Sequence, residues 1–522
     1  MALNRRDLMK VALVETGIVS TLNPLLASAD ESAINRWDET TDILIIGAGN
    51  AGIPAAIQAA DLGASVLLID KNPFIGGMLN ISGGHISGAN SKLQIAKGIE
   101  DSPALHYRDA MRMGRYENNS ELLKLAVEHA AAMIDWLAEI GVEFTPESPF
   151  FENDHEHYSA PRTYMGPDYA RSLLHPLKAE LQKRIDTGQI ILQLNTSITR
   201  LLKNREGRIV GAEARSKAGK ITEQKAKAVI LATGGYGASD SLKNKYNPKI
   251  AKSKVICLPH ATGDGIVMAE KIGARLINME KFISFPGAVE GSSGRLQHAP
   301  DHLTDGVWIN KQGNRFVNEQ TLNPDQRERA FLKQKDFGFF YIFDHQTRKT
   351  GAGIIGWDEK QMQEGISRGI VKQASTIKTL ARKIYVSEEQ LAATITRFNQ
   401  AVRSGVDSDY NRQRLTRTLS TQPFYSIPIT GSILISHGGI AVNHLLQAVD
   451  ETNAAIQGLF AVGETLGSAQ MMGTAVLSGM SVGPAITLGR LAARNAYRYA
   501  RSDPFLLAEC EHNKSMENKA LS

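Results

Sequence analysis

A short apolar run ends in three glycines spaced G-x-G-x-x-G in the segment DILIIGAGNAG, residues 42–52. This spacing is typical of the turn from a strand to a helix that binds the pyrophosphate of a dinucleotide. Gly47 allows a tight turn, Gly49 lets the backbone approach the pyrophosphate, and Gly52 lets the helix pack closely on the strand. The N-terminus of the helix then binds the anion.

A second strand ends in a carboxylate at the spacing that a dinucleotide site requires. The segment SVLLID ends at Asp70, about 20 residues after the glycines, where a ribose hydroxyl needs an acceptor. We therefore predict a dinucleotide site, and the alternative is a glycine-rich turn of purely structural use.

The composition is that of a globular protein with room for two or three domains. The chain has 522 residues, of which 42% are hydrophobic and 22% charged. Its 59 basic and 54 acidic residues give a net charge of +5, and the basic residues are scattered, so a nucleic-acid partner is not indicated. Cys257 and Cys510 lie outside any C-x-x-C pattern, which argues against a metal cluster, a zinc site or an attached haem and leaves a disulfide undecided.

The first 29 residues resemble a twin-arginine export signal. Arg5 and Arg6 precede a modest apolar stretch that ends in Ala27-Ser28-Ala29. Glu15 and the Asn23-Pro24 pair interrupt that stretch, so it is too short to span a bilayer. The resemblance implies a soluble protein that the twin-arginine translocase exports to the periplasm after it has folded around its cofactor. The alternative is an amphipathic arm retained in the cytoplasm.

Periodicity and turn residues predict a dinucleotide domain that is interrupted by a cap. We expect helices over 121–140, 168–185, 387–402 and 483–499, and strands over 190–198, 209–214, 226–232, 306–309 and 458–462. The composition shifts between about Met279 and Leu434, which marks the inserted segment. A cleft between the two parts is where substrate sites usually form.

Six motifs in order resemble the superfamily of FAD flavoproteins that contains fumarate reductases and 3-ketosteroid dehydrogenases. They are GAGNAG at Gly47, GGMLNISGG at 76–84, ATGG at Ala232, TGDGIVMAEKIGA at 262–274, GNRFVNE at 313–319 and GLFAVGE at 458–464. The resemblance implies an α/β fold with a Rossmann-like FAD-binding domain interrupted by a smaller α+β cap domain. The boundaries that we expect are 1–29 for the signal, 36–279 and 435–505 for the FAD-binding domain, 280–434 for the cap and 506–522 for a tail.

The resemblance also implies the residues that contact the cofactor. The family wraps the flavin with the segment 76–84, Asp70 would bind the adenosine ribose, and Glu464 with the backbone near Gly463 would contact FAD. The residues assigned to cofactor binding are Gly47, Gly49, Asn50, Ala51, Gly52, Asp70, Lys71, Gly76, Gly77, Met78, Ser82, Gly83, Gly84, Ala232, Thr233, Gly234, Asp264, Gly463 and Glu464.

The FAD is expected to bind without a covalent tether. The histidine that tethers FAD in membrane-bound succinate dehydrogenases falls on Gly77 in this register, and His85 after the turn is expected to be a polar loop residue. No second nucleotide fingerprint is present, so electrons must be exchanged with a separate carrier, a quinone or a cytochrome, or with oxygen.

Four positions depart from the resemblance where fumarate reductases bind two carboxylates and protonate carbon. The matching residues are Phe285, Asn323, Ile435 and Val476, and none of them can pair a carboxylate. Unpaired, desolvated carboxylates would cost several kcal/mol. A fumarate-type substrate is therefore disfavoured, unless the ungapped register is locally wrong.

The C-terminal segment 476–496 resembles the ketosteroid dehydrogenase branch, whose substrates are apolar polycyclic ketones. That branch uses tyrosines as acid and base, but two of the expected positions are Val476 and Asn323. Ser478 matches a serine of some members, with a small residue that packs near the flavin as the alternative.

The protein must supply an acid or base for the carbon next to the one that exchanges hydride. His437 in the SHGG turn is the first candidate because imidazole titrates near neutrality. Tyr164, Tyr169 and Arg171 are further candidates, and structural roles are the alternative for all four. Arg315 is expected to pair structurally with Glu319.

The leading hypothesis is an exported FAD oxidoreductase that makes or removes a C=C bond next to a carbonyl group of a largely apolar substrate, steroid-like or enone-like. The alternatives are a respiratory reductase of an unsaturated monocarboxylate and a flavin-binding partner subunit without catalysis.

Overall fold

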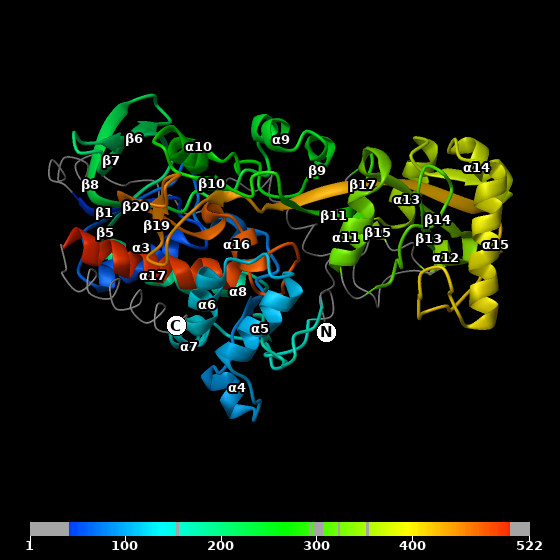
Figure 1. Ribbon diagram of the computed structural model, residues 1–522, viewed down its shortest axis with the longest axis horizontal. Coiled ribbons are helices and arrows are strands. Elements are labelled where there is room, and N and C mark those ends of the chain that lie inside the picture. Colours follow the sequence, from blue (N-terminus) through cyan, green and yellow to red (C-terminus); the bar gives the residue numbers. More distant parts are fainter. Residues whose placement is uncertain are drawn as a thin grey trace.

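The computed structural model describes residues 41–152, 156–292, 295–296, 306–321, 324–350, 354–355 and 357–501. The predicted signal, the predicted tail, Asn323 and Cys510 lie outside the described residues. The described chain forms two bodies, each built around a mixed sheet (Figure 1). The predicted α/β fold is thereby confirmed.

The first sheet runs in the order β19-β20-β8-β1-β2-β5, with β7 joined to β8 and β6 joined to β7. Its central strands β5, β2, β1, β8 and β20 are parallel. The strands of this sheet are β1 (Thr41–Ile46), β2 (Val66–Ile69), β5 (Ile190–Gln193), β6 (Thr196–Lys203), β7 (Ile209–Ser216), β8 (Ile221–Leu231), β19 (Gln447–Val449) and β20 (Ala455–Ala461).

Helices cover the central strands, as the nearly continuous apolar runs of β1 and β2 require. The last long helix, α17 (Val482–Ala500), packs against α3 (Gly52–Asp61) and β8. The other helices of this body are η2 (Gly77–Asn80), α4 (Lys92–Ala96), α5 (Pro103–Met113), α6 (Ser120–Glu128), α7 (Ala130–Glu139), α8 (Arg171–Asp186), α9 (Asp240–Tyr246), η3 (Ile250–Lys252), α10 (Asp264–Lys271), η6 (Gly463–Leu466) and α16 (Ala469–Met472).

Two predicted elements are each divided in the structure. The helix expected over 121–140 is two helices, α6 and α7, because His129 between them has φ −103° and ψ 0°, which is not helical. The strand expected over 190–198 is β5 followed by β6, because Asn195 turns the chain with a positive φ of 53°. Each half of that strand therefore pairs with a different neighbour.

The second sheet runs in the order β13-β14-β17-β11-β12-β15, with β9 and β16 also paired to β17. In Figure 1 the long strand β17 extends from the first body into the second beside β11. The strands are β9 (Lys254–Val255), β11 (Phe282–Val289), β12 (Arg295–Leu296), β13 (Val307–Ile309), β14 (Gly338–Asp344), β15 (Ile354–Ile355), β16 (Lys372–Ala374) and β17 (Phe424–Ser436). The helices of this body are α11 (Pro324–Leu332), η5 (Lys335–Phe337), α12 (His345–Lys349), α13 (Glu359–Ser367), α14 (Ile377–Lys383) and α15 (Glu388–Ser404).

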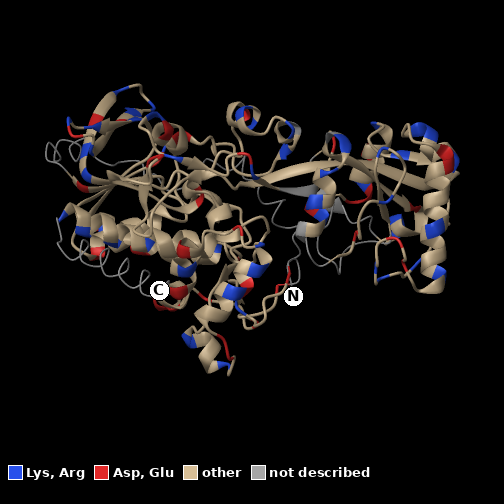
Figure 2. Ribbon diagram, in the orientation of Figure 1, with Lys and Arg blue, Asp and Glu red and all other residues tan. Residues whose placement is uncertain are grey.

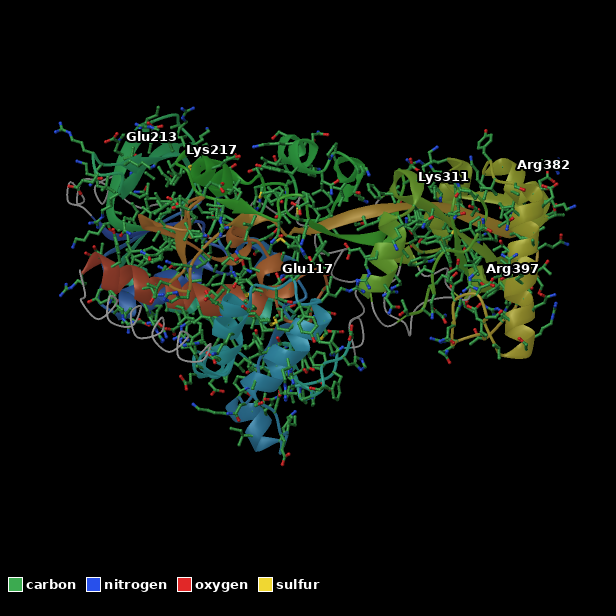
Figure 3. The ribbon with its side chains drawn as sticks, in the orientation of Figure 1. Glu117, Glu213, Lys217, Lys311, Arg382 and Arg397 are labelled. Atoms are coloured by element: carbon green, nitrogen blue, oxygen red, sulfur yellow. The ribbon has the colours of Figure 1, made fainter. Side chains whose placement is uncertain are left out.

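The chain leaves and re-enters the first body at neighbouring places. The strand β10 (Leu276–Ile277) pairs antiparallel with β18 (Gly439–Ile440), so the second body, apart from β9, is an insertion between them. Lys281 Nζ at the start of the insertion donates to Glu117 Oε2 at 2.7 Å and so joins the two bodies (Figure 3 labels Glu117). The predicted boundaries at 280 and 434 lie close to these crossings, and the assignment of domains stays a prediction.

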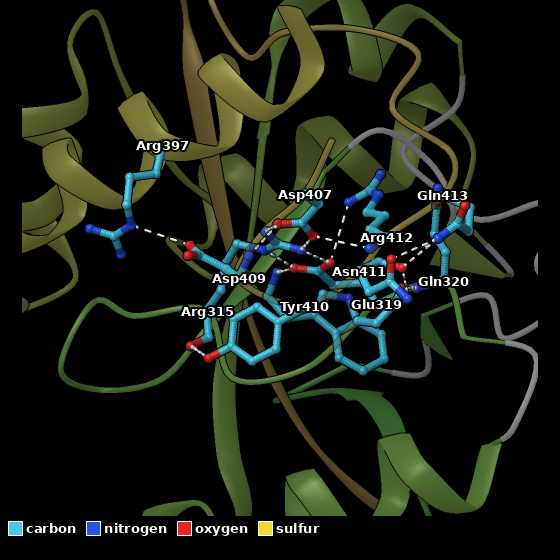
Figure 4. A network of polar contacts seen from close by, with 12 residues as sticks. Arg315, Glu319, Gln320, Arg397, Asp407, Asp409, Tyr410, Asn411, Arg412 and Gln413 are labelled. Carbon is cyan, nitrogen blue, oxygen red and sulfur yellow. Dashed lines mark hydrogen bonds and ion pairs between the residues drawn. The ribbon is translucent and has the colours of Figure 1, made fainter. Parts of the chain in front are cut away.

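A buried ionic network holds the inserted body together (Figure 4). Arg315 donates to both oxygens of Glu319 at 2.9 Å and to Asp407 at 2.9 and 3.0 Å. All three side chains are at most 3% exposed. The predicted structural pairing of Arg315 with Glu319 is confirmed.

Charged residues of both signs are interspersed over both bodies (Figure 2). In the described part of the chain, every helix is too short or too polar to cross a membrane.

Candidate functional site

A cavity of about 1150 Å³ lies where the parallel strands of the first sheet end. Its wall includes Gly47, Asp70 and Ala232, which directly follow β1, β2 and β8, and Gly463, which is the second residue after β20. The carboxyl ends of parallel strands are the usual place of a ligand in an open α/β sheet. Pockets for one small molecule usually have about 300–1000 Å³, so this cavity has room for a dinucleotide and part of a second molecule.

The three fingerprint glycines differ in what surrounds them. A Cβ on Gly47, whose φ is 106°, would overlap the Ala232 carbonyl oxygen, and a Cβ on Gly52 would overlap the Gly47 carbonyl oxygen. Among the described residues, the nearest atom that a Cβ on Gly49 would meet is Gly77 Cα, at 3.9 Å, and Gly49 lines the cavity. The protein itself therefore requires glycine at 47 and 52, whereas only a ligand would require it at 49.

The carboxylate of Asp70 ties the glycine turn to the end of β2. Its Oδ2 accepts from the Ala48 N–H at 2.8 Å, and its Oδ1 accepts from the N–H and the side-chain amide of Asn72. Beside it, Lys71 Nζ donates to Asp264 Oδ2 and to Thr262 Oγ1, both at 2.7 Å. The charge of Lys71 is therefore already balanced by Asp264. Asp70 lies at the cavity wall, and its partners Ala48 and Asn72 are not cations.

A second glycine-rich segment adjoins the first at the cavity wall. Gly77 faces Gly49, and a Cβ on Gly84, whose φ is 72°, would come within 2.5 Å of Ala170 Cα. The approach of Ala170 brings the start of α8 to the cavity. Ser82 and Gly83 line the cavity between these two contacts.

Glu464 is a half-buried residue whose carboxylate lines the cavity. Its Oε1 accepts from both the N–H and the hydroxyl of Ser436 at 2.8 Å. Burial raises the pKa of the Glu464 carboxyl above its usual value, and the Ser436 hydrogen bonds offset part of that effect. A Cβ on Gly235 would overlap both side chains, so glycine there lets the carboxylate reach the wall.

Most residues predicted to bind the cofactor line this one cavity. Gly52 and Gly76 do not line it, because Gly52 packs against Gly47 and Gly76 packs against Leu174. The predicted residues that line it are Gly47, Gly49, Asn50, Ala51, Asp70, Lys71, Gly77, Met78, Ser82, Gly83, Gly84, Ala232, Thr233, Gly234, Asp264, Gly463 and Glu464.

The four predicted acid–base candidates separate into two pairs. Tyr169, with a positive φ of 52°, and Arg171 line the cavity. His437 does not line it and is 3% exposed, its Nε2 makes no hydrogen bond within the described chain, and burial lowers the pKa of its imidazole to about 3. Tyr164 is fully buried and shares a 2.6 Å hydrogen bond with Ser91, and burial raises the pKa of its phenol to about 12. Because packing keeps both side chains from the cavity, the structure corrects the placement of His437 and Tyr164 at the substrate.

Three of the predicted substrate residues line the cavity. They are Ile435, Val476 and Ser478, and the apolar residues Met472 and Leu434 line it as well. Phe285 lies in β11, where its backbone is paired with Ser432 of β17. Asn323 lies outside the described residues.

Buried contacts that could not be predicted from the sequence hold Ser478 in place. Thr163 Oγ1 donates to Ser478 Oγ at 3.1 Å, and the Tyr158 hydroxyl donates to the Ser478 carbonyl oxygen at 2.7 Å. Arg162, which lies over the Tyr158 ring, is fully buried and pairs with Asp101 and Asp109. A packed ionic group thus supports the loop from which Ser478 reaches the cavity.

His85, expected to be a loop residue, lines the cavity as well. Its Nε2 lies 3.1 Å from Glu152 Oε2, and the two side chains are 22% and 11% exposed. No group of three or more metal-ligating side chains occurs within the described ranges.

Comparisons with known proteins agree with this geometry. Residues 42–482 match the model of a family described as FAD binding domain. A probable fumarate reductase of Shewanella frigidimarina is 32% identical over 464 residues, which cover 88% of this chain and 76% of that protein. A urocanate reductase of Eggerthella lenta is 31% identical over 468 residues, which cover 87% and 74%. The fold is similar to that of the 3-ketosteroid delta1-dehydrogenase from Sterolibacterium denitrificans, with a TM-score of 0.74 and 21% identity over 89% of this chain and 100% of that one.

Proposed function

Because this chain belongs to the FAD-binding domain family, we propose that it transfers a hydride to or from carbon at a C–C or C=C bond next to a carbonyl group of a largely apolar compound. The protein is an FAD-dependent oxidoreductase of the family that includes fumarate reductases. Bound FAD supplies or accepts the hydride, and the protein must bind the substrate and move the proton.

The residues at the cavity fit FAD. The uncrowded Gly49 and the N-terminus of α3 suit the pyrophosphate, and Asp70 suits the adenosine ribose. The wall formed by Gly77, Ser82 and Gly83 would then face the flavin. Gly77 occupies the place of a tethering histidine, which supports a noncovalent FAD that acid precipitation should release from the protein.

The proposal about the substrate rests on the apolar residues of the cavity wall. Ile435 and Val476 stand where a dicarboxylate would need cations, and Met472 and Leu434 continue the same apolar wall. A carboxylate buried against this wall would lose its hydration without gaining a partner, which costs several kcal/mol. An apolar ring or chain next to a neutral carbonyl carries no such cost.

An unsaturated monocarboxylate is the second candidate. Arg171 lines the cavity at the start of α8 and could pair one carboxylate, although not two at opposite ends of a molecule. The relatives named for fumarate and urocanate support this candidate as well. A flavin-binding partner subunit without catalysis is a third possibility in which this wall would serve only packing.

The supply of electrons and the place of action belong to the proposal. We propose a separate quinone or cytochrome, or oxygen, as the electron partner. We also propose that the inserted body acts as the cap over the substrate and that the protein reaches the periplasm through the twin-arginine translocase.

One experiment separates these candidates. The FAD-loaded protein is photoreduced without oxygen and mixed with 3-ketosteroids, simple enones, cinnamates or fumarate while flavin absorbance is followed. We expect the fastest reoxidation with a ketosteroid or an enone. Fastest reoxidation by cinnamate would favour the monocarboxylate, comparable reoxidation by fumarate would overturn the argument from the apolar wall, and no reoxidation would favour the partner subunit.

A further inference from the structure

We propose that His85, oriented by Glu152, is the catalytic acid and base that exchanges the proton at the carbon next to the one that exchanges hydride. This proposal rests on the proposed function, because it assigns the proton step of that reaction. Two observations support it: the His85 side chain lines the cavity, and the half-buried Glu152 carboxylate lies 3.1 Å from its Nε2.

The two edges of the His85 ring face different surroundings. Nε2 lies 3.1 Å from Glu152 Oε2. The opposite edge faces Gly83, because a Cβ on Gly83 would lie 3.6 Å from His85 Cε1 and 3.7 Å from His85 Nδ1. Gly83 itself lines the cavity, so Nδ1 is the ring nitrogen nearest to the glycine-rich wall.

Neighbouring contacts fix the direction of the ring. The Phe150 ring meets the His85 ring edge-on at 6.1 Å between centroids. The residue after His85 begins β3 (Ile86–Ser87), which pairs with β4 (Thr163–Tyr164). Because the backbone on one side of His85 is held in a strand pair and its ring is held by Phe150 and Glu152, the imidazole is pre-oriented towards the cavity.

A carboxylate behind an imidazole has a defined chemical use. It fixes the proton on the nitrogen that it contacts, orients the ring and stabilises the imidazolium when the other nitrogen takes up a proton. Glu152 is therefore a positioning residue and His85 the catalytic one. Imidazole suits the exchange near neutral pH because its ordinary pKa lies there.

The other predicted candidates fit this role less well. His437 and Tyr164 are buried away from the cavity. Tyr169 and Arg171 line it and stay the alternatives for the proton step, but near neutral pH a phenol and a guanidinium take up a proton less readily than an imidazole does. Among these side chains, His85 alone combines a place on the wall with an imidazole ring.

Reduction of the C=C bond needs one hydride and one proton. The C=C bond takes a hydride, and thus two electrons, from the reduced FAD on one carbon, and the adjacent carbon takes a proton from the imidazolium at Nδ1. One C=C bond becomes two C–H bonds and a C–C bond, and neutral His85 regains its proton from solvent. Oxidation runs the same exchange backwards, with His85 as the base.

The test compares His85→Gln, His85→Gly and Glu152→Gln with the wild type, each loaded with FAD. The probe is the compound that reoxidises the photoreduced wild type fastest. We expect His85→Gln and His85→Gly to slow reoxidation about 10²–10⁴-fold, the usual range for a positioned acid or base. Added imidazole should restore His85→Gly, whereas pyrazole, which has the same shape but is a far weaker base, should not. Glu152→Gln should lower the rate at saturating probe more than it changes the probe concentration needed for half the rate.

A matched control is His157→Gln, because His157 is an exposed histidine of the same loop that does not line the cavity. We expect it to keep the wild-type rate. Equal rates in His85→Gln and the wild type with the same FAD content would overturn the proposal, and so would rescue by pyrazole as strong as that by imidazole.

A binding measurement decides the matter even if the proposed function fails. The oxidised proteins are titrated with 4-chlorophenol, whose hydroxyl can donate to Nδ1 of His85 while its ring stacks on the flavin. We expect the phenol to perturb the flavin absorbance of the wild type and of His157→Gln, and His85→Gln to bind it at least about tenfold more weakly. Equal affinity for all three proteins, or no perturbation in any of them, would overturn the placement of His85 against the flavin.

Discussion

Thr163 Oγ1 donates a hydrogen bond to Ser478 Oγ at 3.1 Å across the wall of the FAD cavity. Because Ser478 accepts this bond, its own hydroxyl hydrogen is left to donate elsewhere, and Ser478 lines the cavity. The bond joins residues 315 positions apart in the chain, and Thr163 is fully buried. This hydrogen bond gives the cavity wall a fixed hydroxyl donor.

Removal of that donor should change FAD binding. We expect Ser478→Ala to shift the flavin absorption maxima and to weaken FAD binding about 2- to 10-fold, which corresponds to one net hydrogen bond of about 0.5–1.5 kcal/mol. Thr163→Val should cause a shift in the same direction, and Thr163→Ser should retain the wild-type spectrum because it keeps the hydroxyl. The measurement is a fluorescence titration of the apoprotein with FAD, and unchanged spectra in Ser478→Ala would show that the Ser478 hydroxyl does not reach the flavin.

The fingerprint glycines should separate folding from cofactor binding. Gly49→Ala should fold normally, since its Cβ would meet only Gly77 Cα at 3.9 Å, and it should weaken FAD binding at least about tenfold by occupying the path of the pyrophosphate. Gly52→Ala should instead destabilise the apoprotein by several kcal/mol, because its Cβ would overlap the Gly47 carbonyl oxygen.

Thermal unfolding of each apoprotein and FAD titration of the variants that fold provide the readouts. Wild-type FAD affinity in Gly49→Ala would show that the turn does not contact the pyrophosphate. A fully stable Gly52→Ala would show that the helix and strand can separate at this turn.

The parts of the site that lie close together in sequence could be predicted from it, and the parts assembled from distant segments could not. The glycines and Asp70 belong to one strand–helix–strand unit, so their spacing alone places them together. The pairing of β3 with β4 brings His85 and Glu152 together. Contacts with segments far along the chain bury His437. The break at His129 and the positive φ of Asn195 are local backbone choices that periodicity does not reveal.

The buried network of the inserted body should control stability without affecting FAD. Asp407→Ala removes one of the two carboxylates from the buried Arg315 guanidinium, and loss of one partner of such a pair costs about 3–5 kcal/mol. Urea unfolding followed by tryptophan fluorescence measures this loss, since Trp308 lies in the core of the same body. FAD affinity should stay within about twofold of the wild type, because the network lies outside the cavity wall.

Asp409→Ala is the matched control for that variant. Asp409 pairs with Arg397 at 3.2 Å, and both side chains are largely exposed, so this pair should contribute only about 0–1 kcal/mol. Equal losses in the two variants would show that burial of the Arg315 network adds nothing to its contribution.

The buried His437 should make the protein sensitive to acid. Burial lowers the pKa of its imidazole to about 3, so below the ordinary pKa of about 6.5 the unfolded chain binds a proton that the folded protein excludes. The free energy of unfolding should therefore decrease as the pH is lowered. His437 should contribute up to about 1.4 kcal/mol of this loss per pH unit between pH 6.5 and about 3. His437→Gln lacks the titrating group, so urea unfolding at pH 7.5 and 5.5 should show a smaller loss on acidification in the variant than in the wild type. Identical losses would mean that His437 can be protonated in the folded protein, and thus that its ring reaches solvent.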